Sequence, residues 1–273
     1  MGSPAFLPPH AAHEGRSASP VSLTDRCLDA GHGLVTGLIS ASAGAARSAI
    51  FALASLAGGV ARCASGRSRE GLPQLKQGLW RMAQLPVDVV LMVSVRVLSA
   101  AQVLSGLETL GRRLTDAEVA RLRPIFGGSL DYGAVRVKEG PLGLLGVTGR
   151  AFAHGDTVFL PPGDSAADFG LLVHELTHVW QHQHGGTAYL SAALLAQYLG
   201  DGYDWRKAVS QRRRWAELNP EQQAQLIQDA VEAHLVPPVS APTAQVRLRG
   251  WSDSALSLLD EAMDCLYAGR GAP

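Results

Sequence analysis

The pattern of apolar and polar positions divides the chain into four stretches. Residues 1–23 show no apolar periodicity and predict a disordered arm. Residues 24–110 are dominated by Ala, Leu, Val, Gly and Ser, and predict a hydrophobic helical hairpin. Residues 111–235 alternate between helical and strand patterns and predict one mixed domain. Residues 236–273 predict a Pro-rich linker and an amphipathic helix at about 252–268. The expected fold class is therefore α+β and predominantly helical.

The hydrophobic stretch predicts two long helices, at about 28–63 and about 83–110, with a shorter helix near 71–82. Charged residues within it leave two interpretations open. Arg47 interrupts the first apolar segment, and Asp88 and Arg96 interrupt the second. Such charges are costly at a bilayer centre, which favours a soluble hairpin packed on the rest of the chain or on a partner. A hairpin that contacts or enters a membrane, with its basic connector facing the cytoplasm, is the alternative. Small residues recur every four positions in the first helix and allow close helix approach: Gly37, Ala41, Ala45 and Ala49.

Capping and turn signals predict the elements of residues 111–235. Thr115 and Glu118 form a capping box that opens a short helix ending near Phe126. Gly155-Asp156 is a strong signal for a β-hairpin, which predicts a small antiparallel sheet. The expected strands are 132–137, 150–154 and 157–160. The expected later helices run from 165–167 to 182–184, over 188–200, and from the Asn219 cap and Pro220 to about His234.

Composition narrows the chemistry. The formal net charge is zero and the pI is near 7.1, which argues against a nucleic-acid-binding protein. The cysteines, Cys27, Cys63 and Cys265, are far apart and odd in number, so we expect folding in a reducing cytoplasm without a disulfide framework. Residues 1–22 lack the apolar run of a cleavable signal peptide. No Cys-x-x-Cys occurs, so any zinc would be held by His and carboxylate side chains.

A His-Glu-x-x-His motif, His174-Glu175-Leu176-Thr177-His178, lies in the helix expected from 165–167. Positions i and i+4 share one face of an α-helix, so both imidazoles can point at one metal ion. Glu175 lies beside the first imidazole, where it can act on a water molecule as general base. The flanking residues are strongly apolar, which predicts a buried helix. Burying two His and a Glu is costly unless a binding partner, such as a metal ion, compensates for their lost hydration.

Catalytic zinc needs a third protein ligand, and three residues compete for that role. His184 lies ten residues after His174, the spacing of the third His in metzincins, but the helix lacks the glycine at which metzincins break it. Glu221 lies 43 residues after His178 and opens a separate capped helix, as in gluzincins. A first-turn Glu can also simply complement the helix dipole. His182 lies too far along the helix to share the metal, and is expected beside the site or at the surface.

Several motifs in residues 111–235 together resemble a known family. They are Phe126-Gly127, Asp131-Tyr132, Val135-Arg136-Val137, Val158-Phe159-Leu160-Pro161-Pro162-Gly163 and the segment from His174 to Gln183. This combination resembles the metallopeptidase-like core domain associated with extracellular contractile injection systems. It is more similar still to Vgr-related and Rhs-associated bacterial proteins linked to type VI secretion. The resemblance implies a zincin-like fold, a Zn²⁺ cofactor and a bacterial secretion context. The similarity of Glu221-Gln222-Gln223-Ala224 to a later helix of that subgroup favours Glu221 as the third ligand.

The expected function is a zinc-dependent metallopeptidase that acts as an effector or an effector-processing protein of a type VI-like system. A further possibility is a toxin whose helical region crosses a target membrane and whose peptidase acts there. His174, His178 and Glu221 would hold Zn²⁺, and Glu175 would be the general base. Strand 157–160 would form the edge along which an extended peptide lies. The candidates for a second oxyanion donor are Tyr198, Tyr203 and His182.

A non-catalytic role is the alternative. The chain would then be a zinc-stabilised adaptor or structural component of the secretion apparatus, with residues 24–110 docking an Rhs- or Vgr-type partner or the membrane. The expected partners are therefore a peptide or protein substrate and the secretion apparatus, without nucleic acid. The expected location is the bacterial cytoplasm before export.

Overall fold

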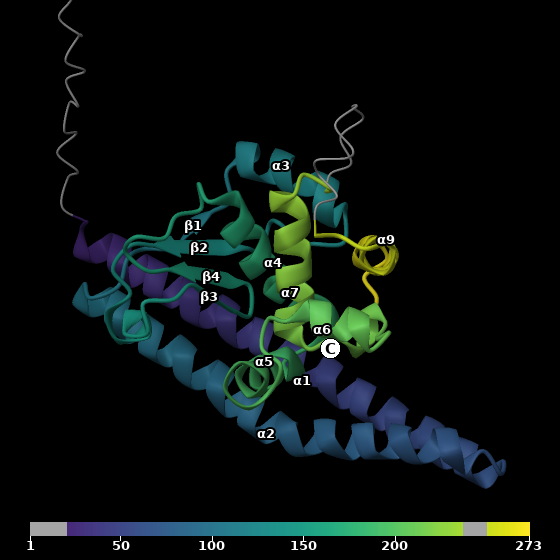
Figure 1. The fold of residues 1–273 in the computed structure, drawn as a ribbon. Coiled ribbons are helices and arrows are strands. Elements are labelled where there is room, and N and C mark those ends of the chain that lie inside the picture. The colour runs from purple at the N-terminus through teal and green to yellow at the C-terminus, as the bar shows by residue number, and fades with distance from the viewer. Residues whose placement is uncertain (1–20, 237–249) are drawn as a thin grey trace, which may run out of the picture.

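A computed structural model describes residues 21–236 and 250–273, in which helices surround one small sheet (Figure 1). Most of the predicted arm (1–20) and of the predicted linker (237–249) lies outside the described residues. The helices are α1 Leu23–Ala64, α2 Ser68–Ser105, α3 Asp116–Phe126, α4 Phe169–Gly185, α5 Ala188–Leu199, α6 Trp205–Ser210, α7 Pro220–Glu232 and α9 Asp253–Tyr267, with 3-10 turns η1 Gly143–Gly146 and η2 Trp215–Glu217. The strands are β1 Arg112–Arg113, β2 Arg136–Glu139, β3 Phe152–His154 and β4 Thr157–Leu160.

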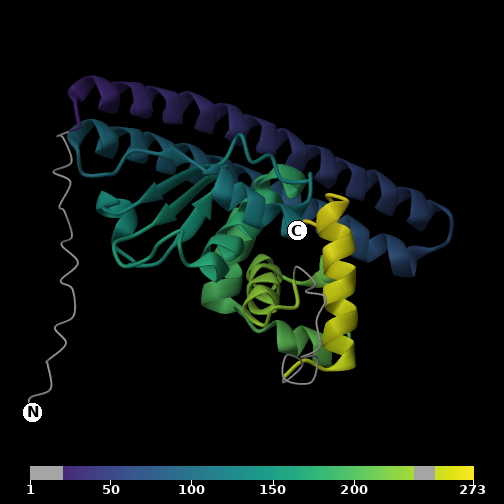
Figure 2. The same cartoon turned by 90° about the horizontal axis from the view of Figure 1, so that it is seen from above.

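Helices α1 and α2 lie side by side as a long antiparallel hairpin (Figures 1 and 2). The predicted separation into helices 71–82 and 83–110 is wrong, because one continuous helix contains both Pro73 and Pro86. Each proline removes a backbone hydrogen bond, and packing along α1 offsets that cost. Helix α2 also ends at Ser105 rather than near 110, because Gly106 takes the left-handed conformation (φ 78°) that closes a helix.

Small residues bring the two hairpin helices into close contact. A Cβ atom added at Gly59 would lie 2.9 Å from the carbonyl oxygen of Gly71, and one at Gly78 would lie 2.9 Å from that of Ala52. Glycine alone allows the backbones to approach this closely. The buried positions of α1 are Ala30, Gly37, Ala41, Gly44, Ser48, Ala52 and Gly59, so spacings of three, four and seven replace the strict four-residue spacing expected.

The charges that interrupt the apolar segments of α2 face the rest of the protein. Asp88 is fully buried, and its Oδ1 accepts a hydrogen bond of 3.1 Å from the backbone N–H of Ser191. Arg96 is also buried and donates to Thr157 Oγ1 at 2.7 Å and to the carbonyl oxygen of His154. These hydrogen bonds mark the face by which the hairpin docks on the sheet and on α5, although Asp88 Oδ2 and Arg96 Nε are buried without a partner among the described residues.

The sheet has the strand order β1-β2-β4-β3. Its outer pairs are antiparallel, but β2 and β4 are parallel, so the predicted antiparallel sheet is in fact mixed. The hairpin of β3 and β4 is confirmed, with Gly155 at φ 57° in its turn. Strand β2 begins at Arg136 rather than 132, because Asp131 Oδ1 accepts hydrogen bonds from the N–H groups of Gly133 and Ala134 and turns the chain there.

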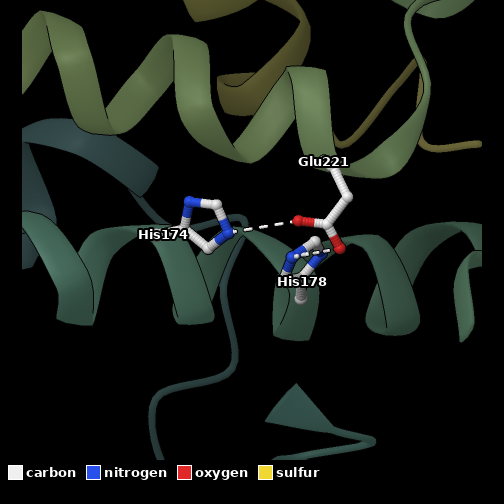
Figure 3. A group of neighbouring side chains, drawn as sticks. All are labelled: His174, His178 and Glu221. Carbon is white, nitrogen blue, oxygen red and sulfur yellow. Dashed lines mark ion pairs between the residues drawn. The ribbon is translucent and has the colours of Figure 1, made fainter. Parts of the chain in front are cut away.

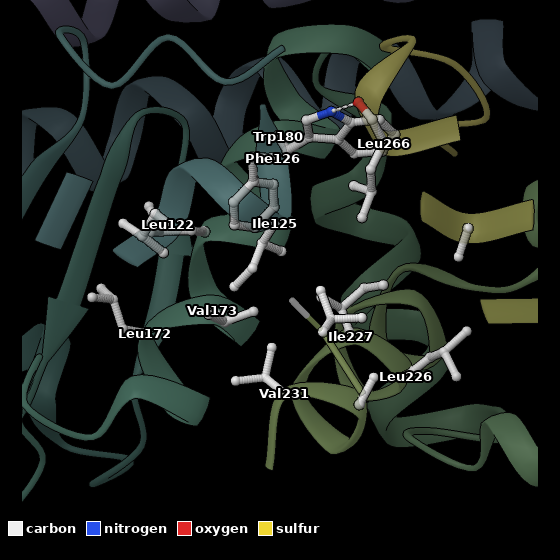
Figure 4. Packing of buried hydrophobic residues seen from close by; sticks show 14 of the residues in the cluster. Leu122, Ile125, Phe126, Leu172, Val173, Trp180, Leu226, Ile227, Val231 and Leu266 are labelled. Carbon is white, nitrogen blue, oxygen red and sulfur yellow. Dashed lines mark hydrogen bonds between the residues drawn. The ribbon is translucent and has the colours of Figure 1, made fainter. Parts of the chain in front are cut away.

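The core lies where α3, α4, α7 and α9 meet (Figure 4). Trp180 of α4 is fully buried there, which confirms its expected role as a core anchor. Its indole N–H lies 3.2 Å from both Ser129 Oγ and the carbonyl oxygen of Leu266, so α9 is fixed to α4. Helix α9 occupies nearly the range expected for the amphipathic C-terminal helix. The core therefore holds α4 and α7 at a fixed distance and rotation.

Candidate metal centre

Helix α4 carries the two histidines of the motif. Its first turn is capped by Asp168, whose side chain accepts from the N–H of Leu171 at 3.1 Å. The helix is buried on nearly all sides, and His174, Glu175 and His178 are each at most 6% exposed. The two imidazoles lie edge to face with ring centroids 5.1 Å apart. The four-residue spacing thus places both rings in one small buried region.

Helix α7 brings a carboxylate to the same region. Asn219 and Gln222 form a reciprocal capping box, and Pro220 occupies the first turn. Glu221 therefore projects from the first turn of α7 toward α4 (Figure 3). Its Oε2 lies 3.4 Å from His174 Nε2, and its Oε1 lies 3.5 Å from His178 Nε2. The structure thus brings together two imidazoles and one carboxylate from separate helices.

This group has the composition and size of a zinc site. One ligand atom from each of His174, His178 and Glu221 lies within 4.8 Å of the others, so the three residues could hold a metal ion. Two ligands of a tetrahedral zinc, each about 2.0–2.1 Å from it, lie about 3.4 Å apart. The His–Glu separations of 3.4 and 3.5 Å match that value. Glu221 Oε2 is buried without a hydrogen-bond partner, an arrangement that a bound cation would satisfy.

Gln181 fixes the protonation pattern of His178. Its Nε2 donates to the carbonyl oxygen of Pro220 and to Gln223 Oε1, both at 3.0 Å. The carbonyl can only accept, so the Oε1 of Gln181 must be the atom that lies 2.8 Å from His178 Nδ1. His178 therefore carries a proton on Nδ1, and Nε2 is the nitrogen that can bind a metal.

Gln197 of α5 supports the carboxylate. Its Nε2 donates to Glu221 Oε1 at 2.8 Å and leaves Oε2 without a hydrogen bond. The orientation of Glu221 is thus held from α5, while the helix cap holds its backbone. Such outer contacts keep a ligand in the position that a metal requires.

Electrostatics couple Glu221 to the histidines. Burial alone would raise the pKa of Glu221, but His178 and His174 hold the pKa of that carboxyl well below its usual range. Burial would lower the pKa of His178, but the Glu221 carboxylate raises it to about 9. Without a metal, His178 is therefore a cation paired with Glu221 at neutral pH. A metal ion would have to displace that proton.

Glu175 is the other carboxylate beside the group. Burial raises the pKa of the Glu175 carboxyl, and the neighbouring His174 and His178 act in the opposite direction. Its Oε2 is buried without a hydrogen-bond partner, and the residue lines a cavity shared with the three candidate ligands. An unpaired carboxylate oxygen next to a candidate metal position can accept a proton from a water molecule.

The cavity over this group has a volume of about 590 Å³. Leu91 and Val95 of α2 form part of its wall, together with residues of β3 and α5. The hairpin is thus part of the site. The expectation that strand 157–160 forms a free edge is wrong, because β4 lies between β2 and β3 and is fully buried. The edge strand beside the cavity is β3, whose residues Phe152, Ala153 and His154 line it.

The structure separates the three candidate oxyanion donors. Tyr203 lies against His174 with ring centroids 5.8 Å apart and lines the cavity. Burial raises the pKa of Tyr203 to about 12, and Glu221 acts in the same direction, so the hydroxyl keeps its proton. Tyr198 lines the cavity but is 72% exposed. His182 points away to α1, where its Nε2 lies 2.8 Å from Ser40 Oγ. His182 is also buried rather than at the surface.

His184 is not brought to the candidate metal centre. Its Nε2 lies 2.9 Å from the carbonyl oxygen of Ser129, and its ring packs on Trp180. The reason is that α4 continues to Gly185 without the break that would turn His184 back toward His174.

Sequence reasoning missed several residues that shape the site. Gln181 follows His178 by three positions and so shares its helix face, a signal that the sequence contained. Gln197, Leu91 and Val95 come from other helices, and no local pattern marks them. Tyr189 packs on His178 with ring centroids 6.2 Å apart, and its hydroxyl accepts from the N–H of Gly155 at 2.9 Å. It thereby links the site to the turn between β3 and β4.

Comparisons with known proteins agree with the resemblance in the sequence. Residues 114–186 match the eCIS core domain family, a segment that holds His174, Glu175 and His178 but not Glu221. An alignment over 131 residues, which covers 44% of this chain, shows 33% identity to the type VI secretion system spike protein VgrG2b of Pseudomonas aeruginosa. The match covers only 13% of that protein's length. No solved structure gives a significant match. These similarities support a relationship to contractile injection and type VI secretion proteins.

Proposed function

We propose that this chain is a zinc-dependent metallopeptidase that acts in a bacterial contractile injection or type VI-like secretion system, as an effector or as an effector-processing protein. The observation that carries the proposal is the convergence of His174, His178 and Glu221, with Glu175 beside them, on one large cavity. Two histidines, a glutamate and a neighbouring carboxylate are the residue set of zinc hydrolases. The similarity to a spike protein supports the secretion context.

His174, His178 and Glu221 would hold Zn²⁺, which supplies a Lewis acid that polarises a peptide carbonyl and lowers the pKa of water. Glu175 takes the proton from the attacking water on its free Oε2 and passes it to the leaving amine. Tyr203 keeps its proton at neutral pH and donates a hydrogen bond to the developing oxyanion. The apolar walls, including Leu91 and Val95, exclude water and receive a substrate side chain.

Substitution of four residues tests this proposal. Glu175→Gln should keep one equivalent of zinc and lower the hydrolysis rate of unfolded casein by about a hundredfold or more, because only the general base is lost. Glu221→Ala should lose tight zinc binding, whereas His184→Ala, the matched control, should keep it. Tyr203→Phe should lower kcat more than it changes KM. Zinc content is measured by mass spectrometry, and peptide cleavage by fluorescence. Tight zinc in Glu221→Ala, or full hydrolysis by Glu175→Gln, would contradict the assigned roles.

A structural role for the metal is the second candidate. The observation in its favour is that the ligands join α4 to α7, so a bound ion would cross-link two core helices. The similar region of VgrG2b also belongs to a protein named as a spike component. In this case Glu175→Gln would change neither proteolysis nor the biological phenotype, and loss of function would instead follow deletion of residues 24–110. Assays of proteolysis and of the phenotype with both variants therefore separate the adaptor from the peptidase.

A further inference from the structure

The outer half of the hairpin, residues 50–82, extends beyond the rest of the molecule (Figures 1 and 2). The nearest side-chain contacts to the body come from Ser48, which accepts from the N–H of Thr187, and from Gln84, which donates to Ser191 Oγ. Between them, the side-chain hydrogen bonds of the described residues stay within the hairpin, as in the pair Arg67–Glu70. The body therefore leaves this half uncovered.

In the outer half, small residues lie between the two helices and most large apolar residues are exposed to solvent, which is the opposite of a water-soluble hairpin. Glycines lie at the contact between the helices, where Gly59 meets Leu75 and Gly78 meets Leu56, and the other large apolar residues are exposed. A soluble amphipathic hairpin buries its large apolar residues between the helices, whereas small interfacial residues with large outer ones are typical of helices in lipid. The exposed residues are Ile50 64%, Phe51 44%, Leu53 58%, Val60 58%, Leu72 60%, Leu79 62%, Trp80 56% and Met82 39%.

The same half is strongly basic. It contains five basic residues and one acidic residue, which give a net charge of +4 in a chain whose net charge is zero. Apolar and aromatic residues interleaved with Lys and Arg are typical of helices that lie at an anionic membrane surface. The basic residues are Arg62, Arg67, Arg69, Lys76 and Arg81.

We propose that residues 50–82 bind the surface of an anionic lipid bilayer and insert their apolar side chains into one leaflet. Phe51 and Leu53 are both exposed, yet lie about 200° apart around α1, so a flat protein surface would not cover both. Lipid surrounds an inserted helix and covers both sides. Helix α1 meets the length and hydropathy of a membrane span, with only 22% of that window buried. The outer part of α1 is about 22 Å long, too short for a core of about 30 Å, so it inserts without spanning.

Flotation of the full-length protein with vesicles tests this proposal. We expect the protein to float with phosphatidylcholine vesicles that contain about 30% of the anionic lipid phosphatidylglycerol. With pure phosphatidylcholine vesicles, the amount of floated protein should be about tenfold lower. The double variant Leu53→Glu/Leu79→Glu should lower binding about tenfold or more, because each buried leucine contributes to partition. Val35→Glu, at a similarly exposed position in the inner half of α1, is the matched control and should float normally.

Tryptophan quenching locates the contact on the protein. Trp80 is 56% exposed, and the other four tryptophans are each at most 9% exposed. Brominated lipids should therefore quench the tryptophan fluorescence of the wild-type protein but not that of the Trp80→Phe variant. Light scattering after gel filtration gives the oligomeric state of wild type and of the double variant. The proposal would be overturned if the wild-type protein did not float, or if the double variant floated equally well. It would also be overturned if the wild type were a dimer that the double variant dissociates, because the surface would then bind a second copy of the chain. The Glu175→Gln protein should float like wild type, so failure of the peptidase proposal leaves this result unchanged.

Discussion

Gln181 determines which nitrogen of His178 faces Glu221. Its amide is oriented by the carbonyl oxygen of Pro220 and by Gln223, which itself donates to the carbonyl oxygens of Trp215 and Gly271. Each hydrogen bond in this series to a backbone carbonyl has an unambiguous donor, so the tautomer of His178 follows from the position of the backbone. A single side chain outside the cavity lining thereby orients a candidate metal ligand.

Gln181→Leu should weaken zinc binding by about 10–100-fold, because His178 loses the partner that orients it. It should also lower the free energy of unfolding of the metal-free protein by about 1–3 kcal/mol, since the carbonyl of Pro220 and Gln223 lose a buried partner. Gln183→Leu, on the same helix, is the control. Gln183 bonds to Asp131 and Asp156 away from the site, so zinc affinity should not change. Chelator competition and urea unfolding measure the two effects, and an unaltered zinc affinity in Gln181→Leu would refute the role of the amide.

Zinc affinity should depend steeply on pH. Glu221 raises the pKa of His178 to about 9, so the proton on Nε2 competes with the metal at every lower pH. Zinc affinity should therefore fall as the pH falls below about 9, by about tenfold per pH unit for one displaced proton. Competition titrations between pH 6 and 8.5 measure this slope, and calorimetry in two buffers counts the proton released. An affinity that stays flat over this range would show that His178 is neutral in the metal-free protein.

Helix α2 shows how one element serves both the fold and the site. Two of its buried polar side chains, Asp88 and Arg96, dock it on α5 and the sheet. Leu91 and Val95 lie between them in sequence and face the cavity. Because the same helix anchors itself and walls the cavity, the hairpin sets the shape of the space available to a substrate.

Leu91→Phe should change which peptides are cleaved. The larger ring narrows the cavity wall, so kcat/KM should fall about tenfold or more for peptides with a bulky apolar side chain and change little for those with Ala. Val90→Phe is the matched control, because Val90 is 63% exposed and lies outside the cavity lining. A peptide series with one varied position measures the effect. Equal losses of kcat/KM for peptides with large and with small side chains would mean that α2 does not contact the substrate.

The elements that the sequence predicted well are those with local signals. The capping box at Thr115 and the cap at Asn219 placed α3 and α7, and Gly155 placed the β3–β4 turn. The parallel pairing of β2 with β4 and the continuity of α2 through Pro86 depend on contacts between distant segments, which no local pattern records. The same division holds at the site. The spacing of the histidines was local, whereas Gln197 and the α2 wall reach it only through tertiary packing.

At the scale of the whole molecule, the hairpin is fixed to the body by a few buried polar contacts. Arg96 fills the space that Gly37 leaves open on α1, where an added Cβ would lie 2.5 Å from the Cδ of Arg96. Its guanidinium reaches Thr157 and the carbonyl of His154 on the sheet. One side chain thus connects α1, α2 and the β3–β4 hairpin.

Arg96→Met should loosen this connection. The apolar stem remains, but Thr157 and the His154 carbonyl lose a charged donor, so the free energy of unfolding should fall by about 2 kcal/mol. Hydrogen exchange should rise at β3 and β4, next to the cavity. Arg69→Met, an exposed position near the hairpin turn, should change neither quantity. If Arg96→Met unfolds like wild type, the hairpin is fixed by its apolar contacts alone.

The separation of the candidate ligands along the chain also has a consequence for the order of synthesis. His174 and His178 leave the ribosome together, but Glu221 follows His178 by 43 residues. At about 5–20 residues per second, this interval lasts about 2–9 s. During that time the nascent chain holds an incomplete centre, while the helix that will wall the cavity has already been made. Under the proposed function, any chemistry that needs Glu221 therefore begins only after that residue has emerged.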